Sequence, residues 1–237
     1  MVKGNHSAPG VLMSRLRVHA FTITLDGFGT GTDQRADAPF GDGVEGLHDW
    51  MMPSFSRRRS RQGSTPIGEL DPSSGEGAGA DDAAFRAGEE DVGATIMGRN
   101  MFGPVRGPWP DESWRGWWGE TPPYGHDVFV LTHHPRPPLV MDGGTTFHFL
   151  AATPAEVLAR ATEAAGGRDV RLGGGVATVR AFLSEGLVDE LHLVVAPILA
   201  GAGERLFEGL VDLPAVYRVD ALVPGGVGNA HVTIVRR

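Results

Sequence analysis

The hydrophobic and polar positions of this chain follow two alternating patterns, which predict strands and helices in succession. Short apolar segments rich in β-branched and aromatic residues are typical of buried strands, and they occupy residues 17–25, 94–97, 128–132, 146–150, 170–172 and 189–197. Stretches with apolar residues every three or four positions are typical of amphipathic helices, and they occupy residues 44–52, 81–90, 153–166 and 176–183. This order predicts an α/β sheet flanked by helices.

Residues 170–183 combine a strand, a glycine turn and a helix. The strand ends in Gly173, Gly174 and Gly175, and Gly186 suits the end of the following helix. A helix N-terminus offers unpaired N–H groups and partial positive charge, and glycines let a phosphate come close to the backbone. The same glycines also suit a tight turn that needs them only for its dihedral angles. On this stretch alone, both interpretations stay open.

The two ends of the chain and one internal stretch depart from this pattern. Residues 1–14 lack an apolar core, so we expect a disordered N-terminal extension rather than a signal peptide. Residues 54–79 hold an arginine cluster followed by Gly, Ser and Pro, which indicates a flexible insertion; an anion site is the alternative interpretation. Residues 213–222 and 231–235 are expected to pair as an antiparallel hairpin. We therefore expect residues 15–237 to form one domain that contains the insertion and the hairpin.

Composition excludes several classes of function. The 237 residues contain no cysteine, which rules out disulfides, thiol nucleophiles and Cys-based zinc sites and fits the cytoplasm, where we expect this protein. Lys3 is the sole lysine, so a P-loop is impossible. The net charge of -8 disfavours nonspecific nucleic-acid binding, and no apolar run is long enough to span a membrane. The histidine spacing matches no metal-hydrolase motif, and we expect no metal.

Three predicted strands end in loops that suit a phosphorylated ligand. Residues 98–100 offer the Arg99 guanidinium, residues 132–134 a hydroxyl and two imidazoles, and residues 173–175 bare amides. Ligands of open α/β sheets bind outside the carboxyl ends of the strands. Each loop alone has a simpler interpretation, such as a surface salt bridge for Arg99. Together they predict a phosphorylated cofactor.

These loops also carry a family resemblance. The chain resembles the dihydrofolate reductase-like superfamily, and within it the C-terminal reductase domain of the bifunctional deaminase-reductase of riboflavin biosynthesis. The resemblance covers residues 15–237 apart from the insertion. It implies a three-layer fold with a mixed, mostly parallel central sheet, helices on both faces and an antiparallel C-terminal hairpin. It rests on the segments TLDGF at 24–28, MGRNMF at 97–102, LTHHP at 131–135, LGGG at 172–175 and DELHL at 189–193 with Pro197 and the Gly-Ala-Gly at 201–203.

The resemblance implies NADPH as the cofactor. The turn at 98–100 would meet the adenosine 2′-phosphate, residues 132–133 the adenine ribose, and residues 173–178 the pyrophosphate. Ala20 and the loop at 26–27 would line the nicotinamide. In chain order, the implied cofactor-binding residues are Ala20, Gly27, Gly98, Arg99, Asn100, Thr132, His133, Gly173, Gly174, Gly175, Val176, Ala177 and Thr178.

The same resemblance implies hydride transfer to a C=N or C=O bond of a pterin, pyrimidine or similar small heterocycle. Asp49 is the nearest candidate for the acidic residue of dihydrofolate reductases, and Asp26 is a second; we expect Trp50 and Thr22 to contact substrate. Structural alternatives are a solvent-facing Asp49, an Asp26 that bonds its own turn, and a Trp50 in the core. The functional alternative is a non-catalytic nucleotide- or small-molecule-binding protein. The riboflavin-pathway relatives suggest a homodimer.

Overall fold

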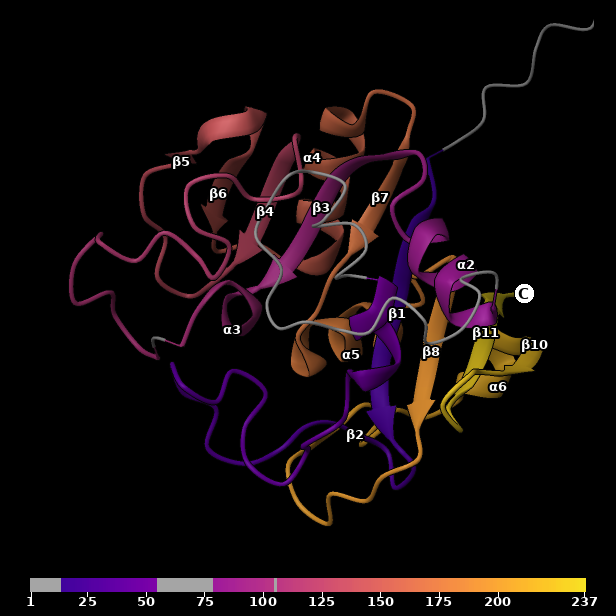
Figure 1. The fold of residues 1–237 in the computed structure, drawn as a ribbon. Helices are drawn as coiled ribbons and strands as arrows, with labels where there is room; N and C mark the ends of the chain where they lie inside the picture. Colours follow the sequence, from indigo (N-terminus) through magenta and orange to yellow (C-terminus); the bar gives the residue numbers. More distant parts are fainter. Residues whose placement is uncertain (1–13, 55–78, 105) are drawn as a thin grey trace, which may run out of the picture.

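A mixed sheet forms the centre of the computed structural model, which describes residues 14–54, 79–104 and 106–237 (Figure 1). Within these residues the sheet has nine strands in the order β10-β11-β8-β1-β7-β3-β4-β6-β5. Their bounds are β1 Leu16–Thr24, β3 Val92–Gly98, β4 Asp127–Leu131, β5 Leu139–Val140, β6 Thr146–Leu150, β7 Asp169–Leu172, β8 Glu190–Ala196, β10 Tyr217–Pro224 and β11 Ala230–Arg236. A separate pair joins β2 (Phe28–Thr30) to β9 (Glu204–Arg205).

The direction of the strands confirms the predicted fold class. From β8 to β6 every neighbouring pair is parallel. The β10–β11 hairpin joins β8 antiparallel, and β5 closes the other edge antiparallel. The parallel strands are buried apolar segments, as expected of strands covered on both faces. The result is an α/β fold with a mostly parallel sheet and an antiparallel C-terminal hairpin.

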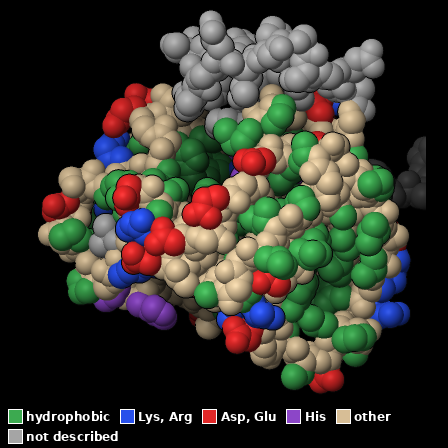
Figure 2. Space-filling model, turned by 60° about the horizontal axis from the view of Figure 1, so that its bottom comes forward, with side chains coloured by type: hydrophobic (Ala, Val, Ile, Leu, Met, Phe, Trp, Pro, Cys, Tyr) green, Lys and Arg blue, Asp and Glu red, His purple; other side chains and the backbone are tan. Residues whose placement is uncertain are grey.

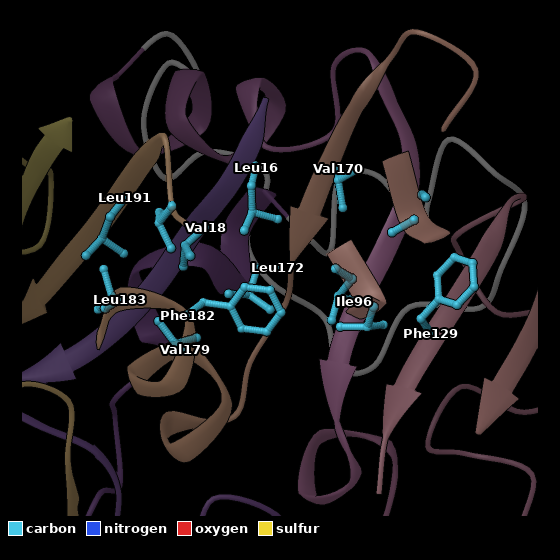
Figure 3. Close-up of a cluster of buried hydrophobic side chains, with 14 of the residues drawn as sticks. Leu16, Val18, Ile96, Phe129, Val170, Leu172, Val179, Phe182, Leu183 and Leu191 are labelled. Atoms are coloured by element: carbon cyan, nitrogen blue, oxygen red, sulfur yellow. The ribbon is translucent and has the colours of Figure 1, made fainter. Parts of the chain in front are cut away.

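Two helices cover one face of the sheet. Helix α4 (Pro154–Ala165) begins with a capping box in which Thr153 and Glu156 bond each other's backbone N–H. Helix α5 (Val176–Ser184) follows the glycine turn directly. Figure 3 shows side chains of α5 packed against those of β1, β3, β7 and β8 in one hydrophobic cluster, to which α4 also contributes.

The opposite face of the sheet carries polar side chains in its central part. Val18 and His19 are neighbours in β1 and therefore point to opposite faces; Val18 lies in the cluster under α5, whereas His19 Nε2 bonds the Ala84 carbonyl of α2 (Ala80–Ala87). Strand register places Arg171 between Arg17 and Thr95 on this second face. Helix α2 thus completes a third layer over a polar part of the sheet.

A second hydrophobic cluster lies near β4 and β6. It gathers Met97, Phe102, Phe147 and Phe149, with tryptophans of the 103–125 loop packed against it. Helix α3 (Arg99–Phe102) is a single turn that supplies Phe102. The loop holds no helix or strand among its described residues, and its tryptophan side chains hold it against the sheet.

Two predicted elements are shorter than expected. The helix predicted over residues 44–52 is wrong for its first half: Gly46 has a φ of +84°, which interrupts helical geometry, and only a 3₁₀ turn, η1 (Asp49–Met51), leads into helical residues 52–54. The strand predicted to begin at residue 213 begins at Tyr217, because Leu213–Val216 form helix α6 with proline in its first turn. The predicted N-terminal extension and most of the insertion, residues 1–13 and 55–78, lie outside the described residues.

Candidate active site

The three predicted ligand loops meet at one edge of the sheet, where neighbouring strands β7, β3 and β4 end. The Gly98 N–H donates to the Gly174 carbonyl at 2.5 Å, and the Gly173 N–H donates to Ile96 at 2.8 Å. Gly98 pairs with Leu131 in β4, so the 132–134 loop begins beside it. Figure 2 looks onto that end of the molecule and shows a recess with hydrophobic side chains at its floor.

The glycine turn has no room for larger residues where it meets β3. A Cβ added to Gly98 would lie 2.1 Å from Thr178 Oγ1, and one added to Gly173 would lie 3.0 Å from the Met101 sulfur. Gly174 has a φ of +133°, a conformation that favours glycine. The turn ends at Gly175, which precedes α5 without a side-chain cap. The first N–H groups of α5 therefore lack intrahelical partners.

Arg99 and Arg136 lie around Trp109. The guanidinium carbon of Arg99 is 3.6 Å from the indole centroid, and that of Arg136 is 4.2 Å from it. Arg99 Nη1 donates to the Gly107 carbonyl at 2.5 Å. Arg99 Nε and Nη2, and Arg136 Nη1, are buried without a hydrogen-bond partner among the described residues. Burial is the main cause that lowers the pKa of both guanidinium groups, as expected when charged groups lose contact with solvent.

Asp26 binds donors from two segments. Its Oδ1 accepts from Thr24 Oγ1 at 2.6 Å and the Ala200 N–H at 3.1 Å, and its Oδ2 accepts from the Gly201 N–H at 2.8 Å. The Thr24 hydroxyl, more than any other group, lowers the pKa of Asp26 to about 2. Asp26 therefore stays ionised near neutral pH and fastens the end of β1 to the loop before β9.

Asp49 and Trp50 are neighbours in η1 but have different surroundings. Asp49 is exposed and lines a hollow of about 250 Å³ together with Phe40 and His48. Burial lowers the pKa of His48 to about 4. Trp50 is only 3% exposed, and its Nε1 donates to Thr22 Oγ1 at 3.0 Å. Thr22 and Trp50 thus bind each other in the interior, next to the sheet.

A buried polar cluster was not among the predicted site residues. His192 of β8 and His231 of β11 are each 5% exposed, and they lie between Ala20 of β1 and Asp81 of α2. In the sequence, His192 is a polar residue within the otherwise apolar segment 191–196, and this is a local signal that could have pointed to it. The pairing of β8 with β11, which no local pattern gives, brings it to His231.

Two further features concern the described residues as a whole. No group of three or more His, Cys, Asp or Glu side chains in the described part of the chain is placed to hold a metal ion. None of the helices described is both long and apolar enough to cross a membrane.

Solved structures with the same fold include proteins described in terms of riboflavin biosynthesis. A putative riboflavin biosynthesis protein from Shewanella sp. PV-4 is 21% identical with a TM-score of 0.55, over 95% of this chain and 99% of its own. A pyrimidine reductase-like protein from Corynebacterium diphtheriae is 14% identical with a TM-score of 0.52, over 96% and 93%. RibD from Acinetobacter baumannii is 17% identical with a TM-score of 0.51, over 95% of this chain and 58% of its own.

At these identities the structures establish the fold alone. A search of curated proteins finds no match. The family model described as the RibD C-terminal domain, however, matches residues 18–217. That match spans the sheet from β1 to the start of β10 and includes all three ligand loops. The chain therefore belongs to the RibD C-terminal domain family.

Proposed function

We propose that this protein is an NADPH-dependent reductase that transfers a hydride to a C=N or C=O bond of a pterin, pyrimidine or similar small heterocycle. Membership of the RibD C-terminal domain family indicates a reductase. The observation that carries the choice of cofactor is Arg99, whose Nε and Nη2 are buried without partners at the sheet edge where ligands of α/β proteins bind. A phosphate supplies the acceptors that these donors lack.

The residues at this edge fit the other parts of a dinucleotide. The bare turn at 173–175 and the first amides of α5, those of Val176, Ala177 and Thr178, suit a pyrophosphate. Arg99 with Asn100 suits the 2′-phosphate, and Thr132 with His133 suits the adjoining ribose.

NADPH, when bound, supplies the hydride, so the protein has to orient the reactants, exclude water and manage one proton. In our proposal Ala20 and Gly27 line the nicotinamide, and Thr22 and Trp50 form the wall on the substrate side. The exposed carboxyl group of Asp49 handles the proton. Asp26, which already accepts three hydrogen bonds, orders the loop beside the nicotinamide. We also propose that the protein acts in the cytoplasm as a homodimer.

Arg99→Ala tests the cofactor assignment. We expect the variant to bind NADPH roughly ten- to a hundred-fold more weakly, because hydrogen bonds to a charged group are worth about 1.5–3 kcal/mol. NADH, which lacks the 2′-phosphate, should lose far less. Isothermal titration calorimetry with both cofactors gives the comparison. Arg115→Ala is the matched control, since Arg115 lies in the same loop region but already pairs with Glu120 at 3.0 Å. Equal losses for the two cofactors would contradict the assignment.

One observation favours a protein that binds the nucleotide without turnover: Asp26 already accepts three hydrogen bonds, which leaves it poorly placed to deliver a proton. Adding dihydrofolate or an aminopyrimidine to the NADPH complex and following the absorbance of NADPH at 340 nm separates the two functions. Oxidation that Asp49→Asn abolishes supports the reductase. Tight binding without oxidation of any such heterocycle supports the binder.

A further inference from the structure

Four groups from four elements form one hydrogen-bonded chain on the polar face of the sheet. Asp81 of α2 lies with its Oδ1 2.8 Å from His231 Nε2. His231 Nδ1 lies 3.1 Å from His192 Nε2, and the two ring planes are within 6° of each other. His192 Nδ1 lies 3.1 Å from the Ala20 N–H. The chain runs from the helix that covers this face to the backbone of β1.

The backbone amide at one end determines where every proton in the chain lies. The Ala20 N–H can only donate, so His192 Nδ1 accepts and the neutral ring carries its proton on Nε2. That proton is donated to His231 Nδ1, which leaves the His231 proton on Nε2 to be donated to Asp81. Burial lowers the pKa of His192 to about 3, which keeps this imidazole neutral. Along the four groups each donor then faces an acceptor. Asn229 Nδ2, which lies 3.3 Å from His231 Nε2, donates instead to Asp81 Oδ1 at 2.8 Å.

Asp81 is itself held firmly in place. Its Oδ2 accepts from the Gly226 N–H at 2.7 Å, and its Oδ1 accepts from Asn229 Nδ2 at 2.8 Å. Both partners belong to the turn between β10 and β11. The carboxylate is therefore a fixed anchor, and the two imidazoles transmit its position to β1.

Ala20 lies at an irregular point of β1. Its φ of +56° is rare for a residue other than glycine, and the pairing of β1 with β8 shifts register between Val18 and Phe21. Such a conformation costs about 1–3 kcal/mol and persists only where the surroundings impose it. Pairing of β1 with β7 ends at Val18. Beyond that point the Phe21 ring lies against the glycine turn, 3.6 Å from where a Cβ of Gly174 would be.

We propose that Asp81, His231 and His192 are positioning residues: their chain holds the bulge at Ala20 in the shape that receives the nicotinamide end of the cofactor. This inference rests on the proposed function, in which Ala20 lines the nicotinamide. None of the three side chains acts on the substrate. They act through the Ala20 N–H, which donates its hydrogen bond to His192 at the end of the chain.

Two substitutions at one position separate the two ends of His192. In His192→Asn the amide oxygen takes the place of Nδ1 and can still accept from Ala20, whereas in His192→Gln the amide group reaches the place of Nε2 and leaves the Ala20 N–H without a partner. The ligands are NADPH and adenosine 2′,5′-bisphosphate, which has the 2′-phosphate but no nicotinamide. Isothermal titration calorimetry gives both dissociation constants.

We expect His192→Gln to weaken NADPH at least ten-fold while binding of the bisphosphate changes less than two-fold. His192→Asn keeps the acceptor for Ala20 but loses the bond to His231, so it should bind NADPH more weakly than the wild type and more tightly than His192→Gln. The control is His148→Asn, which breaks a separate imidazole–carboxylate pair with Asp127 (3.0 Å) between β4 and β6 and should leave both ligands unaffected. A general loss of structure would instead weaken both ligands in parallel, and that result overturns the positioning role.

Nitrogen-15 NMR of the histidines tests the chain without any cofactor. We expect His192 and His231 both to carry the proton on Nε2, assigned from the loss of their signals in single Asn variants. A proton on Nδ1 of His192 would overturn the inference even if NADPH binds. If the wild type binds the bisphosphate but Asn and Gln at position 192 behave alike toward NADPH, the positioning role fails while the proposed cofactor stands. If the wild type binds neither ligand, the proposed function fails as well.

Discussion

Asp26 and Asp49 are aspartates with the same predicted role but different surroundings in the structure. Both were predicted as catalytic acids from the same resemblance. Asp26 accepts three hydrogen bonds at the end of β1, whereas Asp49 is exposed beside a hollow. Arg99 could be singled out from its residue type and its place after a strand. The partners of Asp26 could not, because Ala200 and Gly201 are remote in sequence.

Asp26→Asn should therefore lower stability at pH 7, because it removes the charge to which three donors point. The pKa of Asp26 is lowered from 3.8 to about 2, so its stabilising contribution is present above pH 3.8 and disappears as pH falls toward 2. Urea unfolding of both proteins from pH 7 to pH 2 measures this. The difference in midpoint should shrink below pH 4; a constant difference would contradict the assignment.

At the scale of elements, the sequence pattern predicted the helices and strands whose formation depends on residues close together in the chain. The parallel strands are recognisable because their β-branched runs are buried on both faces, and α4 because Thr153 and Glu156 cap it. The first half of the helix predicted over residues 44–52 is wrong because Gly46, with a positive φ, interrupts it. The contact between the turns at 98 and 173–175 follows from strand order, which the pattern of one segment does not contain.

Gly98→Ala probes that contact between turns. The new Cβ would lie 2.1 Å from Thr178 Oγ1, so we expect a loss of about 1–3 kcal/mol in unfolding free energy, as for other overpacked sites. Adding Thr178→Ala removes the clashing oxygen and should recover more than half of the loss. Urea unfolding of the single and double variants measures this. A double variant no more stable than Gly98→Ala would show that the crowding lies elsewhere.

For the whole molecule, the histidines that folding shields from water determine how stability responds to pH. Burial is the main cause of a lowered pKa at four histidines: it lowers the pKa of His48 and His126 to about 4 and that of His192 to about 3. For His19 burial lowers the pKa below its usual value of 6.5. The four come from different regions of the chain, so their effect is global. Composition showed nine histidines but could not show which of them folding removes from water.

Stability should accordingly fall as pH drops from 6.5 toward 4. In that range the unfolded chain takes up protons that these four imidazoles of the native state do not. Urea midpoints between pH 7 and pH 4.5 measure the slope, because the contribution of Asp26 to stability stays constant over that range. His48→Phe, which keeps a ring against Phe40, should flatten the slope, and a midpoint independent of pH over this range would refute the prediction.

The placing of two tryptophans gives the molecule internal optical reporters. Trp109 is in contact with the guanidinium groups of Arg99 and Arg136, and Trp50 lies edge-on to His231 with a ring separation of 5.4 Å. An anion that draws Arg99 away from Trp109 changes the emission of that indole, whereas a rearrangement near Ala20 is sensed by Trp50. Fluorescence of single-tryptophan variants can thus tell which end of a dinucleotide arrives first, without any attached dye.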